Sequence, residues 1–131
     1  MAILLDHLIV PSRNPVASAQ FLADLLGVPW ETERGHFTPV YVNAELTLDF
    51  AQREQFDWHH YCFHVSEAEF DSIFARVGAA GIPYRSTPRG DHDMQINTRL
   101  GGRNFYWNDS EGHIWEVLTV SYARQDAAVA G

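Results

Sequence analysis

The chain has 131 residues, of which 46% are hydrophobic and 20% are charged, and its formal net charge is −8. This length and composition predict one soluble globular domain with a core of its own. The negative charge argues against a nucleic-acid-binding protein, since phosphate backbones are bound by clustered Lys and Arg. No apolar run approaches the roughly 20 residues that a membrane span needs. The start of the chain lacks the basic region of a signal peptide.

The chain holds a single cysteine, Cys62, so no internal disulfide can form. One cysteine and no leader segment are typical of a protein in a reducing compartment, and we expect a cytoplasmic protein.

The first half of the chain predicts a strand, a helix and a hairpin, in that order. The apolar run that opens the chain stops at Pro11, which suits the end of a short buried strand. Asn14 is a good helix N-cap, and Gly27 is a good C-terminal stop. The predicted elements are a strand over 4–10, a helix over 15–26, and strands over 37–42 and 46–50.

The second half repeats this order. Ser66 and Glu69 have the spacing of a capping box at the start of a helix, and Gly81 ends it. The predicted elements are a strand over 60–65, a helix over 67–80, a strand over 94–98 inside a long loop, and a closing hairpin of 103–108 with 114–120. The tail from Tyr122 is expected to fray.

Short stretches of the two halves resemble each other directly. His7-Leu8-Ile9-Val10 corresponds to His60-Tyr61-Cys62-Phe63, and Gly27-Val28-Pro29-Trp30 corresponds to Gly81-Ile82-Pro83-Tyr84. Neither half has enough core to be stable alone. The repeat therefore predicts an α+β fold in which two modules, about 4–52 and 58–120, form one domain over 1–120, followed by a tail over 121–131. We expect their curved sheets to enclose a central cavity.

The repeat also predicts a metal site, because each module carries a histidine early in its first strand. His7 and His60 hold matching places, and Glu116 lies in the last predicted strand. Two neutral imidazoles and one carboxylate suit Fe(II), Mn(II), Ni(II) or Zn(II) and leave positions open for substrate. Strand side chains alternate between faces, so a shift of the strand register by one residue would make His59 the ligand in place of His60.

These residues resemble the vicinal oxygen chelate superfamily, which includes glyoxalase I, extradiol dioxygenases, fosfomycin-resistance enzymes and bleomycin-resistance proteins. The resemblance rests on Leu5-Asp6-His7-Leu8-Ile9-Val10, on His60-Tyr61-Cys62-Phe63 and on Asp109-Ser110-Glu111-Gly112-His113-Ile114-Trp115-Glu116. It covers residues 4–120. It implies paired βαβββ modules, a glyoxalase-like fold, and a divalent metal bound by His7, His60 and Glu116. Ser110 departs from the proline that is usual in the family.

The resemblance also suggests roles around the metal. Asp49 matches the place of a fourth ligand in glyoxalase I, but its side chain is shorter. It could therefore face the substrate, or be an ordinary solvent-facing acid. Tyr106 matches a tyrosine that faces the substrate in related enzymes, and could stabilise an oxygen anion or be a core aromatic. His64 is a candidate acid or base, or a packing residue. Arg103 is a candidate for binding an anionic group of the substrate.

The sequence thus supports a metal-dependent enzyme of the glyoxalase or dioxygenase type, acting on a small substrate that chelates the metal through adjacent oxygens. The alternatives are a binding protein of the bleomycin-resistance type without catalysis, and a metal-bound domain without turnover. Fosfomycin thiol transfer is less favoured, since Ile9 replaces the threonine of those enzymes. Small members of the superfamily form homodimers, so we expect a homodimer, with sites either within one subunit or shared between two.

Overall fold

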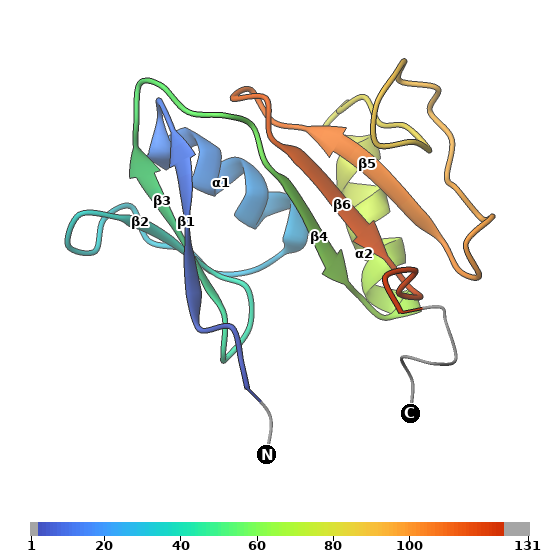
Figure 1. Ribbon diagram of the computed structural model, residues 1–131, viewed down its shortest axis with the longest axis horizontal. Helices are drawn as coiled ribbons and strands as arrows, with labels where there is room; N and C mark the ends of the chain where they lie inside the picture. Colours follow the sequence, from blue (N-terminus) through green and yellow to red (C-terminus); the bar gives the residue numbers. More distant parts are fainter. Residues whose placement is uncertain (1–2, 125–131) are drawn as a thin grey trace. The chain divides into compact units, whose positions relative to one another are not determined.

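The computed structural model describes residues 3–124, which divide into two compact units. The first unit is built from the chain up to Trp58 together with residues 109–111, and the second from residues 59–108 and the chain from Gly112 onward. Each unit contains one helix and one three-stranded sheet (Figure 1). The predicted α+β class with two similar helix-and-sheet modules is confirmed.

The helices and strands follow one another in the predicted order. They are β1 (His7–Ser12), α1 (Pro15–Leu26), β2 (Thr38–Tyr41), β3 (Thr47–Gln52), β4 (His60–His64), α2 (Glu67–Ala79), β5 (Asn104–Asn108) and β6 (Ile114–Leu118). Of the described helices, none is both long and apolar enough to cross a membrane.

The sheet of the first unit has the strand order β1-β3-β2, with β1 parallel and β2 antiparallel to β3. Helix α1 packs on one face of this sheet (Figure 1). Val10, Leu48 and Phe50 are fully or almost fully buried and form the core with the apolar side of the helix. The predicted caps are both present. The side chain of Asn14 accepts a hydrogen bond from the first helical turn, and Gly27 adopts the left-handed conformation with φ of 71°.

The second unit repeats this arrangement with the order β4-β6-β5, in which β4 is parallel and β5 antiparallel to β6. Phe70 of α2 meets Phe105 of β5 edge to face, with ring centroids 5.4 Å apart. The capping box is formed, since Ser66 Oγ accepts from the Glu69 N–H at 3.1 Å and Glu69 Oε1 accepts from the Ser66 N–H at 2.8 Å. The contact between Phe70 and Phe105 shows that Phe105 lies on the face of the sheet that packs on α2.

The predicted bounds of the first strand are wrong at both ends. Strand β1 starts at His7 and continues through Pro11 to Ser12, while Leu4 and Leu5 lie outside the strand and are exposed. A proline is tolerated here because, among the described strands, β1 lies at the edge of its sheet and pairs with β3 alone, so its open side needs no N–H. Pro11 therefore does not end the strand.

The strand predicted over 94–98 does not form. Within residues 3–124, this loop joins the sheet only through a single bridge between Asn97 and Asn104. Met94 has a φ of 55°, which is incompatible with an extended strand. A βαβββ module has a strand directly after its helix. In each unit this strand is reduced to one bridge, between Trp30 and Val40 in the first and between Arg85 and Tyr106 in the second.

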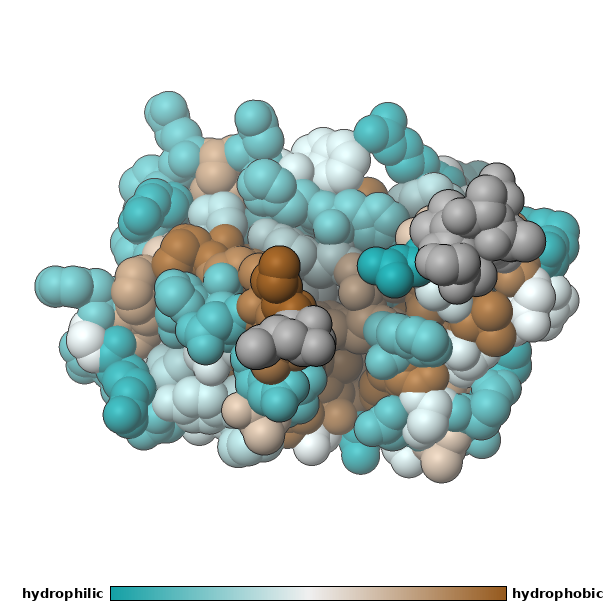
Figure 2. Space-filling view, turned by 60° about the horizontal axis from the view of Figure 1, so that its bottom comes forward, coloured by the Kyte–Doolittle hydropathy of each residue, from teal (hydrophilic) through white to brown (hydrophobic). Residues whose placement is uncertain are grey.

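The surface is mostly hydrophilic on the face shown in Figure 2, with apolar side chains interrupting it. Ile3, Leu4 and Leu5 are the most exposed of the large apolar residues in the described part of the chain, and Ile9 of β1 is also exposed. Exposed apolar side chains next to each other are typical of an interaction surface. Of the tail that was expected to fray, residues 125–131 lie outside the described residues.

Candidate metal centre

The second unit carries its chemistry on the face of the sheet opposite α2, which we call the site face. Glu116 of β6 is paired with Cys62 on one side and Tyr106 on the other, so the three side chains share this face. Side chains alternate along a strand, so His60 and Asn104 lie on it too. The aromatic residues between them, such as Phe105, face the helix.

Glu116 is completely buried, and three side chains satisfy its carboxylate. His60 Nε2 lies 2.9 Å from Oε1, and Asn104 Nδ2 donates to Oε2 at 3.0 Å. The Tyr122 hydroxyl donates to both oxygens, at 2.8 and 3.0 Å. A buried carboxylate without such donors would cost several kcal/mol of stability. The surrounding donors therefore hold the carboxylate in one orientation.

The His60–Glu116 pair fits two ligands of one divalent ion. Metal–nitrogen and metal–oxygen bonds of about 2.1 Å place neighbouring ligand atoms about 3 Å apart, and the two atoms lie 2.9 Å apart. Asn104 and Tyr122 donate hydrogen bonds to the same carboxylate, as the outer partners of ligating carboxylates do. In residues 3–124 no group of three or more His, Cys, Asp or Glu side chains is placed to hold a metal. The third ligand therefore stays a prediction.

Two tyrosine hydroxyls lie beside this pair and keep their protons at neutral pH. Burial is the largest cause that raises the pKa of Tyr106, and the Glu116 charge adds to it against an opposing hydrogen bond with Tyr122. Burial also raises the pKa of Tyr122, helped by hydrogen bonds with Tyr106 and Glu116. The ring of Tyr106 lies 5.8 Å from the ring of His60, centroid to centroid. Both phenols are therefore hydrogen-bond donors rather than bases.

Cys62 lies on the site face and is exposed. It lies on β4, an edge strand, and its side chain points away from α2. The residue is open to solvent on one side only: the protein around its sulfur partly removes water, and this desolvation, followed by the nearby Glu116 charge, raises the pKa of the thiol. A thiol that stays protonated is a poor nucleophile.

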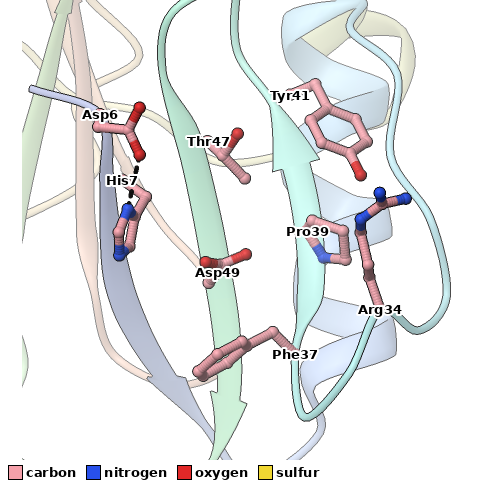
Figure 3. A pocket seen from close by; sticks show the side chains of 8 residues that line it. All are labelled: Asp6, His7, Arg34, Phe37, Pro39, Tyr41, Thr47 and Asp49. Atoms are coloured by element: carbon pink, nitrogen blue, oxygen red, sulfur yellow. Dashed lines mark hydrogen bonds and ion pairs between the residues drawn. The ribbon is translucent and has the colours of Figure 1, made fainter.

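In the first unit, His7 lines a pocket of about 250 Å³ on the face of the sheet opposite α1 (Figure 3). Its Nδ1 bonds to Asp6 Oδ2 at 2.8 Å, which leaves Nε2 as the ring nitrogen for a metal. That hydrogen bond raises the pKa of His7, burial opposes the rise, and the charges of Asp6 and Asp49 add to it. A histidine held by a carboxylate in this way has the usual arrangement of a metal ligand.

Asp49 lines the same pocket as His7, on the neighbouring strand β3 (Figure 3). The opposite wall carries Arg34 and Tyr41, which no pattern in the sequence singled out. The Tyr41 hydroxyl and Arg34 both contact the carboxylate of Glu31, which holds them in place. Asp49 thus faces a pocket rather than open solvent.

The remaining predicted residues lie apart from the His60–Glu116 pair or are engaged elsewhere. His64 Nε2 donates to the Thr119 carbonyl at 3.0 Å, which fixes its tautomer. Arg103 lies on the α2 side, over the Phe70 ring and ion-paired with the helix carboxylates. The structure therefore does not bring Arg103 to the ligand pair. His59 stacks on His113, away from the site face.

Asn104 and Tyr122 are the residues at Glu116 that the sequence analysis missed. Asn104 precedes Tyr106 by two residues, so the alternation of a strand would have placed both on one face. Tyr122 lies in a segment that was expected to fray, and its two hydrogen bonds to Glu116 show that it is held. No sequence signal pointed to it.

Comparison with solved structures finds close relatives. Oxidase ChaP-H1 is 40% identical, with a TM-score of 0.83 over 92% of this chain and 98% of that chain. Oxidase ChaP-H2 is also 40% identical, with a TM-score of 0.85 over 93% and 97%. The fosfomycin resistance protein FosX from Listeria monocytogenes shares the fold at 16% identity, with a TM-score of 0.69 over 92% and 96%.

The chain matches no protein-family model, and no curated protein matches it. The structural matches nevertheless extend over nearly the whole chain, and the two oxidases are similar in sequence as well as in fold. Together with the two repeated helix-and-sheet units, they show that the chain belongs to the vicinal oxygen chelate superfamily.

Proposed function

We propose that the protein is a divalent-metal-dependent enzyme of the oxidase or dioxygenase type, acting on a small organic substrate that binds the metal through adjacent oxygens. The observation that carries the proposal is the buried Glu116 carboxylate, with His60 Nε2 2.9 Å from Oε1. The 40% identity to two proteins named oxidases favours oxygen chemistry over glyoxalase-type isomerisation.

His60 and Glu116 would hold the metal, with His7 as the third ligand. Two histidines and one carboxylate are the ligand set typical of non-haem Fe(II) oxygenases, so iron is the first metal to test, before Mn, Ni and Zn. A bound metal of this kind supplies Lewis acidity and, where it is redox-active, a route for electrons to O₂.

The surrounding side chains prepare the site for an anionic substrate oxygen. Tyr106 keeps its proton and can donate to an oxygen on which negative charge develops. Tyr122 and Asn104 both donate to Glu116, so the carboxylate keeps one orientation while substrate binds. Asp49 lines the pocket of His7, where it would face the substrate.

We further propose that the protein is a homodimer in which each site takes His7 from one subunit and the other two ligands from its partner. The His7 side chain is 57% exposed. Ile9 on the same strand and Leu4 and Leu5 just before it are exposed apolar residues, as an interface would require.

The assay that tests this function compares two reactions on metal-loaded protein. We expect O₂ uptake with a panel of catechols and dihydroxynaphthalenes when Fe(II) is bound, and no isomerisation of hemithioacetals. His60→Ala should abolish the uptake, and His59→Ala should keep it. Isomerisation without O₂ uptake would contradict the oxidase proposal. Tight binding of the panel without any turnover would instead support a binding protein of the bleomycin-resistance type.

A further inference from the structure

The site face carries a second charged group that the chemistry above does not use, the guanidinium of Arg85. Arg85 forms an antiparallel bridge with Tyr106, with backbone hydrogen bonds of 3.0 and 2.9 Å in the two directions. Residues paired in this way project to the same side of a sheet. Arg85 Nη1 also donates to Asn108 Oδ1 at 2.6 Å, and Asn108 lies in the row that holds His60.

Arg85 is only 3% exposed, yet the side-chain donors of its guanidinium meet neutral acceptors in the described part of the chain. Nη2 donates to the Pro88 carbonyl at 2.7 Å, and Nη1 donates to the Asn108 amide. Nε is buried and has no hydrogen-bond partner among residues 3–124. Within residues 3–124, none of the ion pairs includes Arg85. A buried charge is ordinarily paired, because removing it from water costs several kcal/mol.

Asp93 is the carboxylate whose charge acts on Arg85, but its oxygens are already engaged. Oδ1 accepts from the backbone N–H groups of Ser86 and Gln95, and Oδ2 accepts from the Ser86 hydroxyl. Burial lowers the pKa of Arg85 and the Asp93 charge opposes the shift, but an arginine stays a cation in either case. Arg85 thus keeps its positive charge, and none of the described carboxylates forms an ion pair with it.

We propose that Arg85 binds an anionic oxygen group of the substrate, a carboxylate, enolate or phenolate, on the site face beside Tyr106. The oxyanion would accept from two N–H groups of the guanidinium, that of Nε and one of Nη2. For the anion to bind, the Pro88 carbonyl would move away from Nη2, and an anionic oxygen of the substrate would take its place as the acceptor. This assignment rests on the proposed function for the identity of the ligand, and it gives the substrate class: an oxyanion next to the metal-binding oxygens.

The test uses metal-free, full-length protein and the smallest suitable probe, acetate, with acetamide as its neutral counterpart. We expect acetate to shift the NMR resonance of the Arg85 Nε–H group saturably, and acetamide to leave it unchanged. The resonance is assigned by its loss in Arg85→Gln. That variant should bind acetate at least about 10-fold more weakly, the loss of one charged hydrogen bond. Arg76→Gln, an exposed arginine on α2, should bind acetate as the wild type does.

Arg85→Lys keeps the positive charge but lacks the planar pair of N–H donors, so it should bind acetate with intermediate affinity. This variant tests the assignment if Arg85→Gln does not fold. An unshifted resonance in wild type, or equal affinity for acetate and acetamide, would overturn the assignment. Because the protein is free of metal, this result is independent of whether metal binding and O₂ uptake are found. If the protein binds acetate but no metal, the proposed function is contradicted and the anion site at Arg85 is still supported.

Discussion

Glu116→Gln is expected to lower the affinity for divalent metal by at least about 100-fold, more than the loss of an outer partner of a ligand costs. The amide has the shape of the carboxylate but removes the negative charge that would neutralise the cation. Its oxygen can still accept from Asn104 and Tyr122, so the fold should be kept. Affinity is measured by competition with a chromophoric chelator, and folding by thermal unfolding in EDTA.

The matched control is Glu67→Gln, which removes an exposed carboxylate on α2 that pairs with Arg103. It should bind metal as the wild type does. If Glu116→Gln keeps wild-type affinity while remaining folded, Glu116 is not a ligand, and its burial serves only the hydrogen bonds to its neighbours.

Mixing two inactive variants should restore metal binding if the sites are shared between subunits. His7→Ala and Glu116→Ala each break both sites of a homodimer. A mixed dimer of the two keeps one intact site, because the subunit with native His7 faces the subunit with native Glu116. Random pairing of equal amounts therefore restores about a quarter of the wild-type sites, as the two-fold symmetry of the dimer requires. Metal content and O₂ uptake of the unselected co-expressed mixture measure this, and mixed dimers isolated through a different tag on each variant should hold half of the wild-type sites.

The controls are the two variants purified alone, which should hold no metal. A mixture that holds no more metal than either variant alone would place all three ligands within one subunit. A wild-type protein that is monomeric by light scattering at working concentrations would contradict the dimer itself.

The parts of the fold that local signals govern were predictable from the sequence. Asn14, Gly27 and the capping box of Ser66 with Glu69 act within one helical turn, so each end could be predicted from a few neighbouring residues. The bounds of β1 could not, since Pro11 is acceptable only on an edge strand, and which strand lies at an edge depends on the whole sheet.

The same distinction applies to the site. His60 and Glu116 could be selected because each carries a signal of its own, the repeat for one and the turn before β6 for the other. Asn104, Tyr122 and Arg85 gain their roles from partners 12, 6 and 23 residues away. Such contacts follow from strand register and from the path of the loops. No residue-type pattern in a single sequence encodes them.

We propose above that His60 and Glu116 are ligands of one divalent metal. The most direct measurement is the metal content of protein purified without chelator and incubated in turn with Fe(II), Mn, Ni and Zn, for wild type, His60→Ala and His59→Ala. We predict about one metal per chain in wild type and in His59→Ala, and none in His60→Ala, because only His60 faces Glu116. A wild type without metal, or a His60→Ala variant that keeps it, would contradict the claim.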